Sequence, residues 1–291
     1  MNQTILKRVF LFGCPRSGTT LLQSLVAANS SIASFPESHF YEALFSRRRL
    51  LSAFGFSSRR VRSRWNLFLE EIGHPELKLM LPKYAILPRQ YSNAFVKLLD
   101  RLTLEQGKSI WLEKTPGHLN FIDQIEELVK DIRFVHILRN GGDNIASLFE
   151  MVTNYPETWG RWNGSIDECI QRWIIATRTS LRYFNKENHH LVRYEQLVAN
   201  PKSVLIDLCE FIGVQFEEKM MSDYSIIADQ LILKREPWKA SVKEPIWTVK
   251  KSKFNDLLNE EQRLYILAHI PNDLLDFIIH EEQQVRQVCG S

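Results

Sequence analysis

Short apolar runs alternate along this chain with longer stretches in which apolar positions recur every three or four residues. The short runs are typical of buried strands and lie at Val9–Gly13, Ile110–Leu112, Arg133–Leu138 and His190–Val192. The longer stretches predict helices at Thr19–Ala28, Asp123–Lys130, Asp143–Met151, Ile166–Glu187 and Pro201–Gly213. This alternation predicts an α/β fold, with a central parallel β-sheet flanked by helices on both faces.

The last of these helices has the clearest ends, because Asn200 stands at the N-cap position and Gly213 follows the final turn. Open parallel sheets bind their ligands at the carboxyl ends of the strands. Three chemically distinctive stretches begin at such ends, after Phe12, Leu112 and Leu138. We therefore expect the functional site at this edge of the sheet.

Residues 44–105 depart from the alternation and predict a helical, arginine-rich insertion that forms the acceptor side of the site or a lid. Between Ala43 and Leu69 there are seven arginines and no acidic residue: Arg47, Arg48, Arg49, Arg59, Arg60, Arg62 and Arg64. Such a charge run is either a solvated helical face or a basic surface that docks an anionic substrate or carrier.

The composition is that of an ordinary globular protein of 291 residues, with 44% hydrophobic and 24% charged residues. A net charge of +3 is too small to indicate nucleic acid. No apolar run approaches the ~20 residues that span a bilayer, and Met1 to Arg8 lacks the apolar middle of a secretory signal. We expect a cytoplasmic protein with neither a nucleic acid nor a membrane partner; its oligomeric state is left open.

Four cysteines, none of them in a C-x-x-C pair, predict buried reduced thiols rather than a zinc site. They are Cys14, Cys169, Cys209 and Cys289.

A glycine-rich loop, Gly13–Thr20, follows the first strand and opens the first helix. It has the spacing of a nucleoside triphosphate loop, but Thr19 stands where such a loop needs lysine. The strand Arg133–Leu138 is followed by Arg139 instead of the aspartate that helps to hold magnesium. These differences disfavour a magnesium-dependent kinase of the P-loop class, which magnesium-dependent ATP binding would revive, and they predict no metal site.

The remaining features of the loop are those of an anion cradle. The glycines at both ends, including Gly18, permit a tight turn. Backbone N–H groups at the start of the helix point at the anion, and the helix dipole favours negative charge there. Hydroxyl groups come from Ser17, Thr19 and Thr20, and fixed positive charge comes from Arg16. This set suits a nucleotide with one 5′ phosphate group.

The stretch Cys14–Thr20 resembles the 5′-phosphosulfate loop of sulfotransferases that use 3′-phosphoadenosine 5′-phosphosulfate (PAPS). Arg139 with Ser147 eight residues later resembles the 3′-phosphate site of the same family. The chain departs from the family at Asn140–Asp143, where Asp-Pro-Arg-Asp is common, and at Met151, where some members carry a second arginine. The resemblance implies one P-loop-like α/β domain over residues 1–291, PAPS as donor and its product PAP, and sulfuryl transfer without metal.

Three further stretches resemble the tyrosylprotein and heparan branches of that family. Trp111–Pro116 is similar to their K-T-P segment, and Val192–Leu197 to their Y-E-x-L segment, in which Tyr194 would contact the nucleotide. Glu236–Lys239, with Pro245 and Lys253, is similar to the segment that closes over PAPS, and Lys253 keeps the spacing of the binding lysine.

Sulfuryl transfer is an in-line displacement, so it needs a base for the acceptor and cations for the leaving oxygen. Lys114 and Arg16 are the candidate cations. Glu37 occupies the place of the base in the tyrosylprotein-like branch, and His39 is the alternative because its ordinary pKa suits base work near neutral pH. His136 lies within a strand and is interpreted as a packed core residue.

The acceptor is the least determined part of the prediction. Soluble bacterial and cyanobacterial members with a similar Phe35–Phe40 stretch tailor natural products, so we expect transfer to a hydroxyl or amine of a small molecule such as a guanidinium alkaloid. An acyl chain on a carrier protein is the alternative. A non-enzymatic nucleotide-binding protein is a further hypothesis, which intact Glu37 and Lys114 disfavour.

Overall fold

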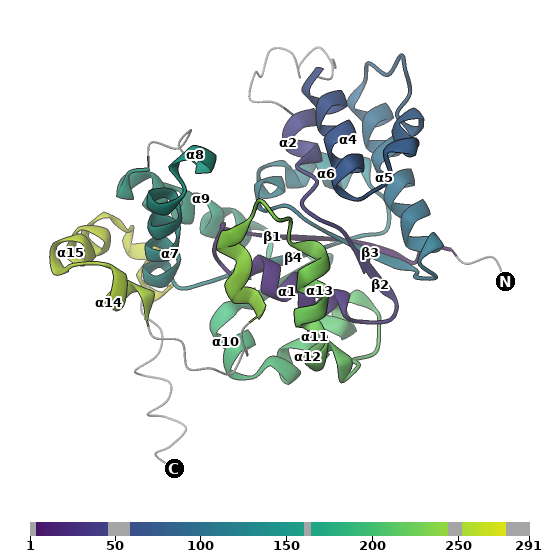
Figure 1. The fold of residues 1–291 in the computed structure, drawn as a ribbon. Coiled ribbons are helices and arrows are strands. Elements are labelled where there is room, and N and C mark those ends of the chain that lie inside the picture. Colours follow the sequence, from purple (N-terminus) through teal and green to yellow (C-terminus); the bar gives the residue numbers. More distant parts are fainter. Residues whose placement is uncertain (1–3, 46–58, 160–163, 244–251, 278–291) are drawn as a thin grey trace.

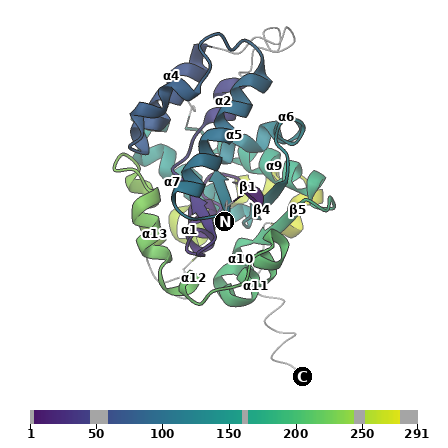
Figure 2. The ribbon, with the colours of Figure 1, turned by 90° about the vertical axis from the view of Figure 1, so that its right-hand side faces the viewer.

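The computed structural model describes residues 4–45, 59–159, 164–243 and 252–277, and the fold is shown in Figures 1 and 2. Its five strands are β1 (Lys7–Gly13), β2 (Ile32–Ser34), β3 (Ile110–Lys114), β4 (Ile132–Leu138) and β5 (His189–Arg193). They form one sheet in the order β2-β3-β1-β4-β5, and every neighbouring pair is parallel. The predicted parallel α/β architecture is confirmed. The three-residue strand β2 was not predicted, because it is too short to show a period.

Helices cover the sheet and follow nearly every strand. Those before β4 are α1 (Thr19–Ala27), α2 (Phe40–Leu44), α4 (Arg59–Glu71), η1 (Pro75–Met80), α5 (Pro88–Glu105), η2 (Pro116–Phe121) and α6 (Ile122–Leu128). Between β4 and β5 lie α7 (Gly141–Asn154), α8 (Pro156–Trp159) and α9 (Ile166–Tyr183). After β5 come α10 (Tyr194–Ala199), α11 (Pro201–Ile212), α12 (Lys219–Ser222), α13 (Tyr224–Leu231), η3 (Pro237–Lys243), α14 (Lys253–Leu257), α15 (Glu260–His269) and η4 (Asn272–Phe277).

The two faces of the sheet carry separate hydrophobic cores, because successive side chains of a strand point to opposite sides. Phe10 and Phe12 of β1 face a core rich in aromatic rings, to which α5, α6 and α9 contribute. Val9 and Leu11 face an aliphatic core under α1 and α11. In both views α2, α4 and α5 lie on one side of the sheet, and α1 and α10–α13 lie on the other (Figures 1 and 2). Each fully buried apolar side chain contributes about 1.5–3 kcal/mol to this packing.

Helix α5 is anchored to two central strands by one aspartate. The carboxylate of Asp100 accepts hydrogen bonds from Arg8 Nη2 at 2.7 Å and from Trp111 Nε1 at 2.7 Å. The C-terminal helix α14 is joined to the start of α7 in a similar way, because Asp143 Oδ1 accepts from Ser252 Oγ and from the Phe254 backbone N–H, both at 3.0 Å. The segments that flank the site are therefore fixed to the sheet layer.

Helix ends differ from their predictions in detail. Gly213 has a φ of 90°, as expected for the residue after a helix, and Asn200 stands at the N-cap of α11 but its side chain makes no capping hydrogen bond. Helix α9 ends at Tyr183, one turn earlier than predicted. Among the described residues, no helix combines the length and apolarity needed to cross a membrane.

The predicted core histidine and cysteines are indeed buried. His136 Nε2 lies 2.9 Å from His189 Nδ1, and Ser180 Oγ is 3.1 Å from the other nitrogen of His136. Burial lowers the pKa of His136 to about 3 and that of His189 to about 4. Three cysteines, Cys14, Cys169 and Cys209, are buried and free, while Cys289 lies outside the described residues.

Candidate active site

The carboxyl ends of all five strands deliver candidate residues to one edge of the sheet. Strand β1 leads into the phosphate loop, and β3 ends at Lys114. Arg139 directly follows β4, Tyr194 directly follows β5, and Glu37 stands three residues beyond the end of β2. Because Leu11 of β1 pairs with Lys114 of β3, and Gly13 with Ile137 of β4, the central strands end at nearly the same level.

The phosphate loop needs glycine at both of its ends. Gly18 has a φ of 95°, and a Cβ at this position would lie 2.4 Å from Tyr194 Cδ2. A Cβ on Gly13 would lie 2.5 Å from Ser17 Oγ and 2.7 Å from the Ile137 carbonyl oxygen. Arg16 also has a left-handed backbone, with a φ of 73°. The loop is therefore a close-fitting turn that presents the N-terminus of the nine-residue helix α1, whose first N–H groups have no partner within the helix.

Two arginines, a serine and a tyrosine from three different elements meet beside this loop. The Arg139 guanidinium lies over the Tyr194 ring, 4.6 Å from its centroid, and its Nη1 donates to the Arg16 carbonyl at 3.2 Å. Arg16 Nε donates to Ser147 Oγ at 3.3 Å. Burial and the neighbouring charge of Arg139 lower the pKa of Arg16. Two buried cations placed this close together favour an anionic ligand.

Buried polar atoms without partners indicate where such a ligand fits. Within the described residues, Ser17 Oγ, Arg139 Nε and Asn144 Oδ1 are buried and make no hydrogen bond. A buried polar group left unpaired costs about 1–3 kcal/mol. The first two of these groups are donors on the two sides of the loop, and acidic oxygens of a phosphate are the acceptors that they lack. No group of three His, Cys, Asp or Glu side chains in the described part of the chain is arranged to hold a metal ion.

A chain of alternating charges starts at the loop and leads away from it. The Lys114 ammonium is 1% exposed, donates to Thr20 Oγ1 at 3.3 Å and forms an ion pair with Glu37 Oε1. Lys239 Nζ lies 2.7 Å from the same oxygen and 2.5 Å from Glu236 Oε1. Lys114, Glu37, Lys239 and Glu236 are called the lysine–glutamate cluster below. The sequence motifs named Glu236 and Lys239 as part of a closing segment but did not identify them as site residues.

Charge and burial act against each other in this cluster. Burial raises the pKa of the Glu37 carboxyl, but the ammonium groups of Lys114 and Lys239 outweigh it and hold that pKa far below its ordinary value. Burial lowers the pKa of Lys114, and the charge of Glu37 offsets this only in part. The pKa of Lys239 is raised despite burial, because two carboxylates face it. The cluster is therefore ionised at neutral pH.

The backbone of the loop that carries Glu37 is held by a buried carboxylate below it. Glu113 Oε1 accepts from Ser38 Oγ and from Thr115 Oγ1, both at 2.6 Å. Glu113 Oε2 lies 2.9 Å from His118 Nδ1, while His118 Nε2 accepts from the Tyr41 backbone N–H at 3.0 Å. Since Nε2 is an acceptor, the proton of this imidazole is on Nδ1 and points at Glu113.

Arg64 of the insertion holds the same loop from the opposite side. It donates to the Glu37 carbonyl at 2.7 Å and to the Ser38 carbonyl at 2.5 Å, and it pairs with Glu71 at 2.8 Å. Arg62 donates to the carbonyl groups of residues 82 and 83. These two arginines face inward and are not part of a free basic surface. Arg47, Arg48 and Arg49 lie outside the described residues, as does the side chain of Arg59.

His39, the alternative base, is placed between two carboxylates. Its Nε2 lies 3.4 Å from Glu37 Oε2, and its Nδ1 lies 3.2 Å from Glu42 Oε2. Burial lowers the pKa of His39, but the hydrogen bond to Glu42 and the charges of both carboxylates raise it above its ordinary value. A histidine that holds its proton more firmly is less suited to accept one.

Lys253 lies apart from the groups described so far. Its Nζ forms an ion pair with Glu150 Oε2 at 2.5 Å, on the surface of α7 and one turn beyond Ser147. Its side chain is 36% exposed. The structure thus places this predicted nucleotide ligand beside α7 and shows it bound to an acid. Pro245, from the same motif, lies outside the described residues.

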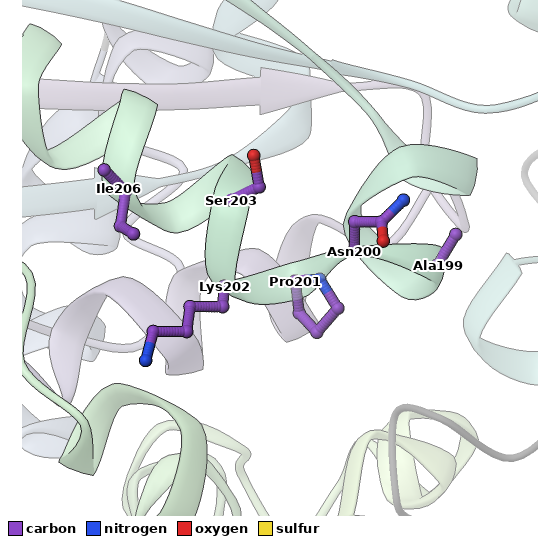
Figure 3. Close-up of a pocket in the computed structure, with 6 residues that line it drawn as sticks. All are labelled: Ala199, Asn200, Pro201, Lys202, Ser203 and Ile206. Carbon is purple, nitrogen blue, oxygen red and sulfur yellow. The ribbon is translucent and has the colours of Figure 1, made fainter.

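A surface hollow of about 540 Å³ opens at the start of α11, and Figure 3 shows its lining. It is lined by Ala199, Asn200, Pro201, Lys202, Ser203 and Ile206. Its single charged side chain, Lys202, already pairs with Glu218. It contains none of the candidate residues, so the active site is assigned to the loop and the lysine–glutamate cluster.

Known proteins share this architecture. A structure titled as a sulfotransferase domain from the Synechococcus PCC 7002 olefin synthase matches with a TM-score of 0.57 and 19% identity, covering 91% of this chain and 95% of that one. A mouse sulfotransferase SULT7A1 complexed with PAP matches with a TM-score of 0.51 and 12% identity, covering 90% and 82%. Identities this low establish the shared fold alone.

Sequence comparison supplies the family. A Drosophila melanogaster protein-tyrosine sulfotransferase is 21% identical over 218 residues, which are 73% of this chain but only 39% of the fly protein. The model of the sulfotransferase family matches residues 8–218, from the first strand to the loop before α12. The phosphate loop, Lys114, Arg139 and Tyr194 all lie inside this match. The chain belongs to the sulfotransferase family.

Proposed function

We propose that this chain transfers the sulfuryl group of PAPS to a hydroxyl or amine of a small-molecule acceptor. The observation that carries the proposal is the contact of one buried lysine with both halves of the site. Lys114 touches the phosphate-loop hydroxyl of Thr20 and the carboxylate of Glu37. A cation between an anion cradle and a base is the arrangement that in-line transfer needs.

The residues around the loop fit the two phosphate-bearing ends of PAPS. Ser17, Thr19, Thr20 and the N-terminus of α1 would hold the 5′ phosphosulfate. Arg139, with its unpaired Nε, and Ser147 would hold the 3′-phosphate, because arginine binds phosphate through paired N–H groups. The PAP found with the mouse sulfotransferase supports this choice of nucleotide. Lys253 would have to leave Glu150 to take part.

In the transfer step, Glu37 takes the proton of the acceptor as the new bond to sulfur forms, and the bond from sulfur to the bridging oxygen breaks. Lys114 and Arg16 stabilise the negative charge that develops on the departing PAP. Glu37 is a weak base while two ammonium groups hold it. When Lys114 turns to the leaving oxygen, one of these charges is withdrawn, and burial then raises the pKa of Glu37 toward a useful value.

For the acceptor we propose a small molecule with a cationic group. The support is Glu42, whose carboxylate is 36% exposed beside His39 and whose pKa is lowered, burial being outweighed by the contact with that histidine. An acyl chain on a carrier protein is the second candidate, because the olefin synthase domain of similar fold also belongs to a biosynthetic enzyme.

The experiment that tests the function uses radiolabelled PAPS and a panel of acceptors. The panel contains guanidinium and amine alkaloids, simple phenols, a tyrosine peptide and a hydroxyacyl carrier protein. We expect labelled product and PAP with at least one small molecule. Magnesium-dependent turnover of ATP without any use of PAPS would contradict the proposal, and so would a failure to bind PAP in calorimetry.

A further inference from the structure

The start of η3 crosses the whole width of the site. We call Glu236–Lys239 the η3 strap. The Trp238 carbonyl accepts a hydrogen bond from Arg16 Nη1 at 2.9 Å, so the strap contacts the phosphate loop. One residue later, Lys239 Nζ lies 2.7 Å from Glu37. The strap is the described segment that contacts both a loop cation and the candidate base.

The two lysines on Glu37 have different second partners. Lys114 shares its ammonium with Thr20 of the loop, and it therefore lies within reach of a group held there. Lys239 shares its ammonium with Glu236, whose other oxygen accepts from the Leu233 backbone N–H at 3.1 Å. Lys239 is thus held by carboxylates alone, and its side chain is only 10% exposed.

We propose that Lys239 is the positioning residue of this site, which keeps the Glu37 carboxylate oriented and ionised while Lys114 turns to the donor. The inference rests on the proposed function of Glu37 as base. It divides two tasks between two ammonium groups that contact one oxygen atom. Glu236 has the matching task of holding Lys239 away from the phosphate loop.

The alternative, in which Lys114 alone sets the charge of Glu37, leaves a difficulty. Glu37 is 13% exposed, and a buried carboxylate without a counter-ion becomes protonated at higher pH. With Lys114 engaged elsewhere, Lys239 and His39 are the remaining positive groups against the Glu37 side chain, while Arg64 contacts its backbone carbonyl. The charged groups around Glu37 are, in full, Lys114, Lys239, His39, Arg64, Glu42 and Glu236.

The test is the pH profile of kcat for Lys239→Met, Lys239→Arg and wild type, with PAPS and a productive acceptor. Removing an opposite charge within about 4 Å raises a carboxyl pKa by about one to three units. We therefore expect the acid limb of the Lys239→Met profile to move up by at least about one unit. The KM for PAPS and the Kd for PAP should change by less than about threefold, and Lys239→Arg should restore the acid limb. Lys234→Met, an exposed lysine beside the strap, is the matched control with an unchanged profile.

Two outcomes overturn the inference. One is a Lys239→Met enzyme whose kcat falls equally at every pH, because that is the result of a merely structural role. The other is an unchanged profile. A second measurement does not depend on turnover: carboxyl carbon NMR, with Glu37 assigned by its loss in Glu37→Gln, should show a higher pKa for Glu37 in Lys239→Met. If the wild type transfers nothing but this pKa rises, the proposed function fails and the role of Lys239 stands.

Discussion

Replacing Glu37 by glutamine removes the one anionic partner that the buried Lys114 has in the lysine–glutamate cluster. Lys239 keeps Glu236, so the loss falls mainly on Lys114, whose side chain is 1% exposed. Breaking a buried ion pair by removing one partner costs about 3–5 kcal/mol. Glu37 is 13% exposed, so we take the lower end of this range, about 3 kcal/mol. The expected fall in melting temperature is about 6 °C or more.

The same substitution should lower turnover by about 100-fold or more, since it removes the base. It should not weaken nucleotide binding. An anion placed in the phosphate loop becomes the counter-ion that Lys114 has lost, so the Kd for PAP should stay equal or decrease. Saturating PAP should then raise the melting temperature of Glu37→Gln by more than it raises that of the wild type.

The assay is thermal unfolding at neutral pH with and without PAP, together with kcat from PAPS. Glu42→Gln is the matched control, because Glu42 is partly exposed and contacts His39 instead of a lysine. Its effect on stability should be about 1 kcal/mol or less. The reasoning is refuted if Glu37→Gln is as stable as the wild type, or if its turnover is normal. It is also refuted if PAP stabilises both proteins equally.

Three further predictions concern the rest of the molecule. Gly18→Ala should reduce affinity for PAP at least about tenfold in calorimetry, because its φ is 95° and its Cβ would meet the Tyr194 ring; unchanged affinity would contradict the described loop. Arg139→Ala should weaken PAP binding by about 10- to 100-fold but leave binding of adenosine 5′-monophosphate unchanged, and equal losses for both would remove the 3′-phosphate assignment. The pKa values of His136 and His189 are lowered by burial, so the unfolded chain takes up more protons below their ordinary pKa. The free energy of unfolding should therefore fall by up to about 1.4 kcal/mol per pH unit for each histidine as pH decreases from about 6.5 to 5, and urea denaturation that is flat over this interval would refute it.

The central part of the fold could be predicted from sequence because its signals are local. The run Val9–Gly13 is uniformly apolar and ends in a glycine-rich turn, so strand, loop and helix follow from neighbouring residues. Strand β2 could not be predicted in this way, since three residues show no period. It exists because Ile32, Ala33 and Ser34 pair with β3.

The candidate site was predictable in proportion to how local its motifs are. Arg139 and Ser147 lie in one strand–helix unit and could be named together. Lys239 could not be assigned a role, because its partner Glu37 lies 202 positions earlier and a single lysine carries no signal of a buried ion pair. The interpretation of Arg64 as part of an exposed basic surface failed for the same reason, since its acceptors are backbone carbonyls of residues 37 and 38.

The assembly of the site from every strand end has a consequence for how the chain matures. Ribosomes extend a chain at about 5–20 residues per second, and the N-terminal part begins to fold first. Glu37 and Lys114 thus emerge well before Lys239, which lies 202 positions after Glu37. Until then Glu37 has only part of its counter-charge. The ability to retain PAP on the nascent chain would mark the moment at which the sheet and the η3 strap have come together, which makes nucleotide capture a readout of vectorial folding.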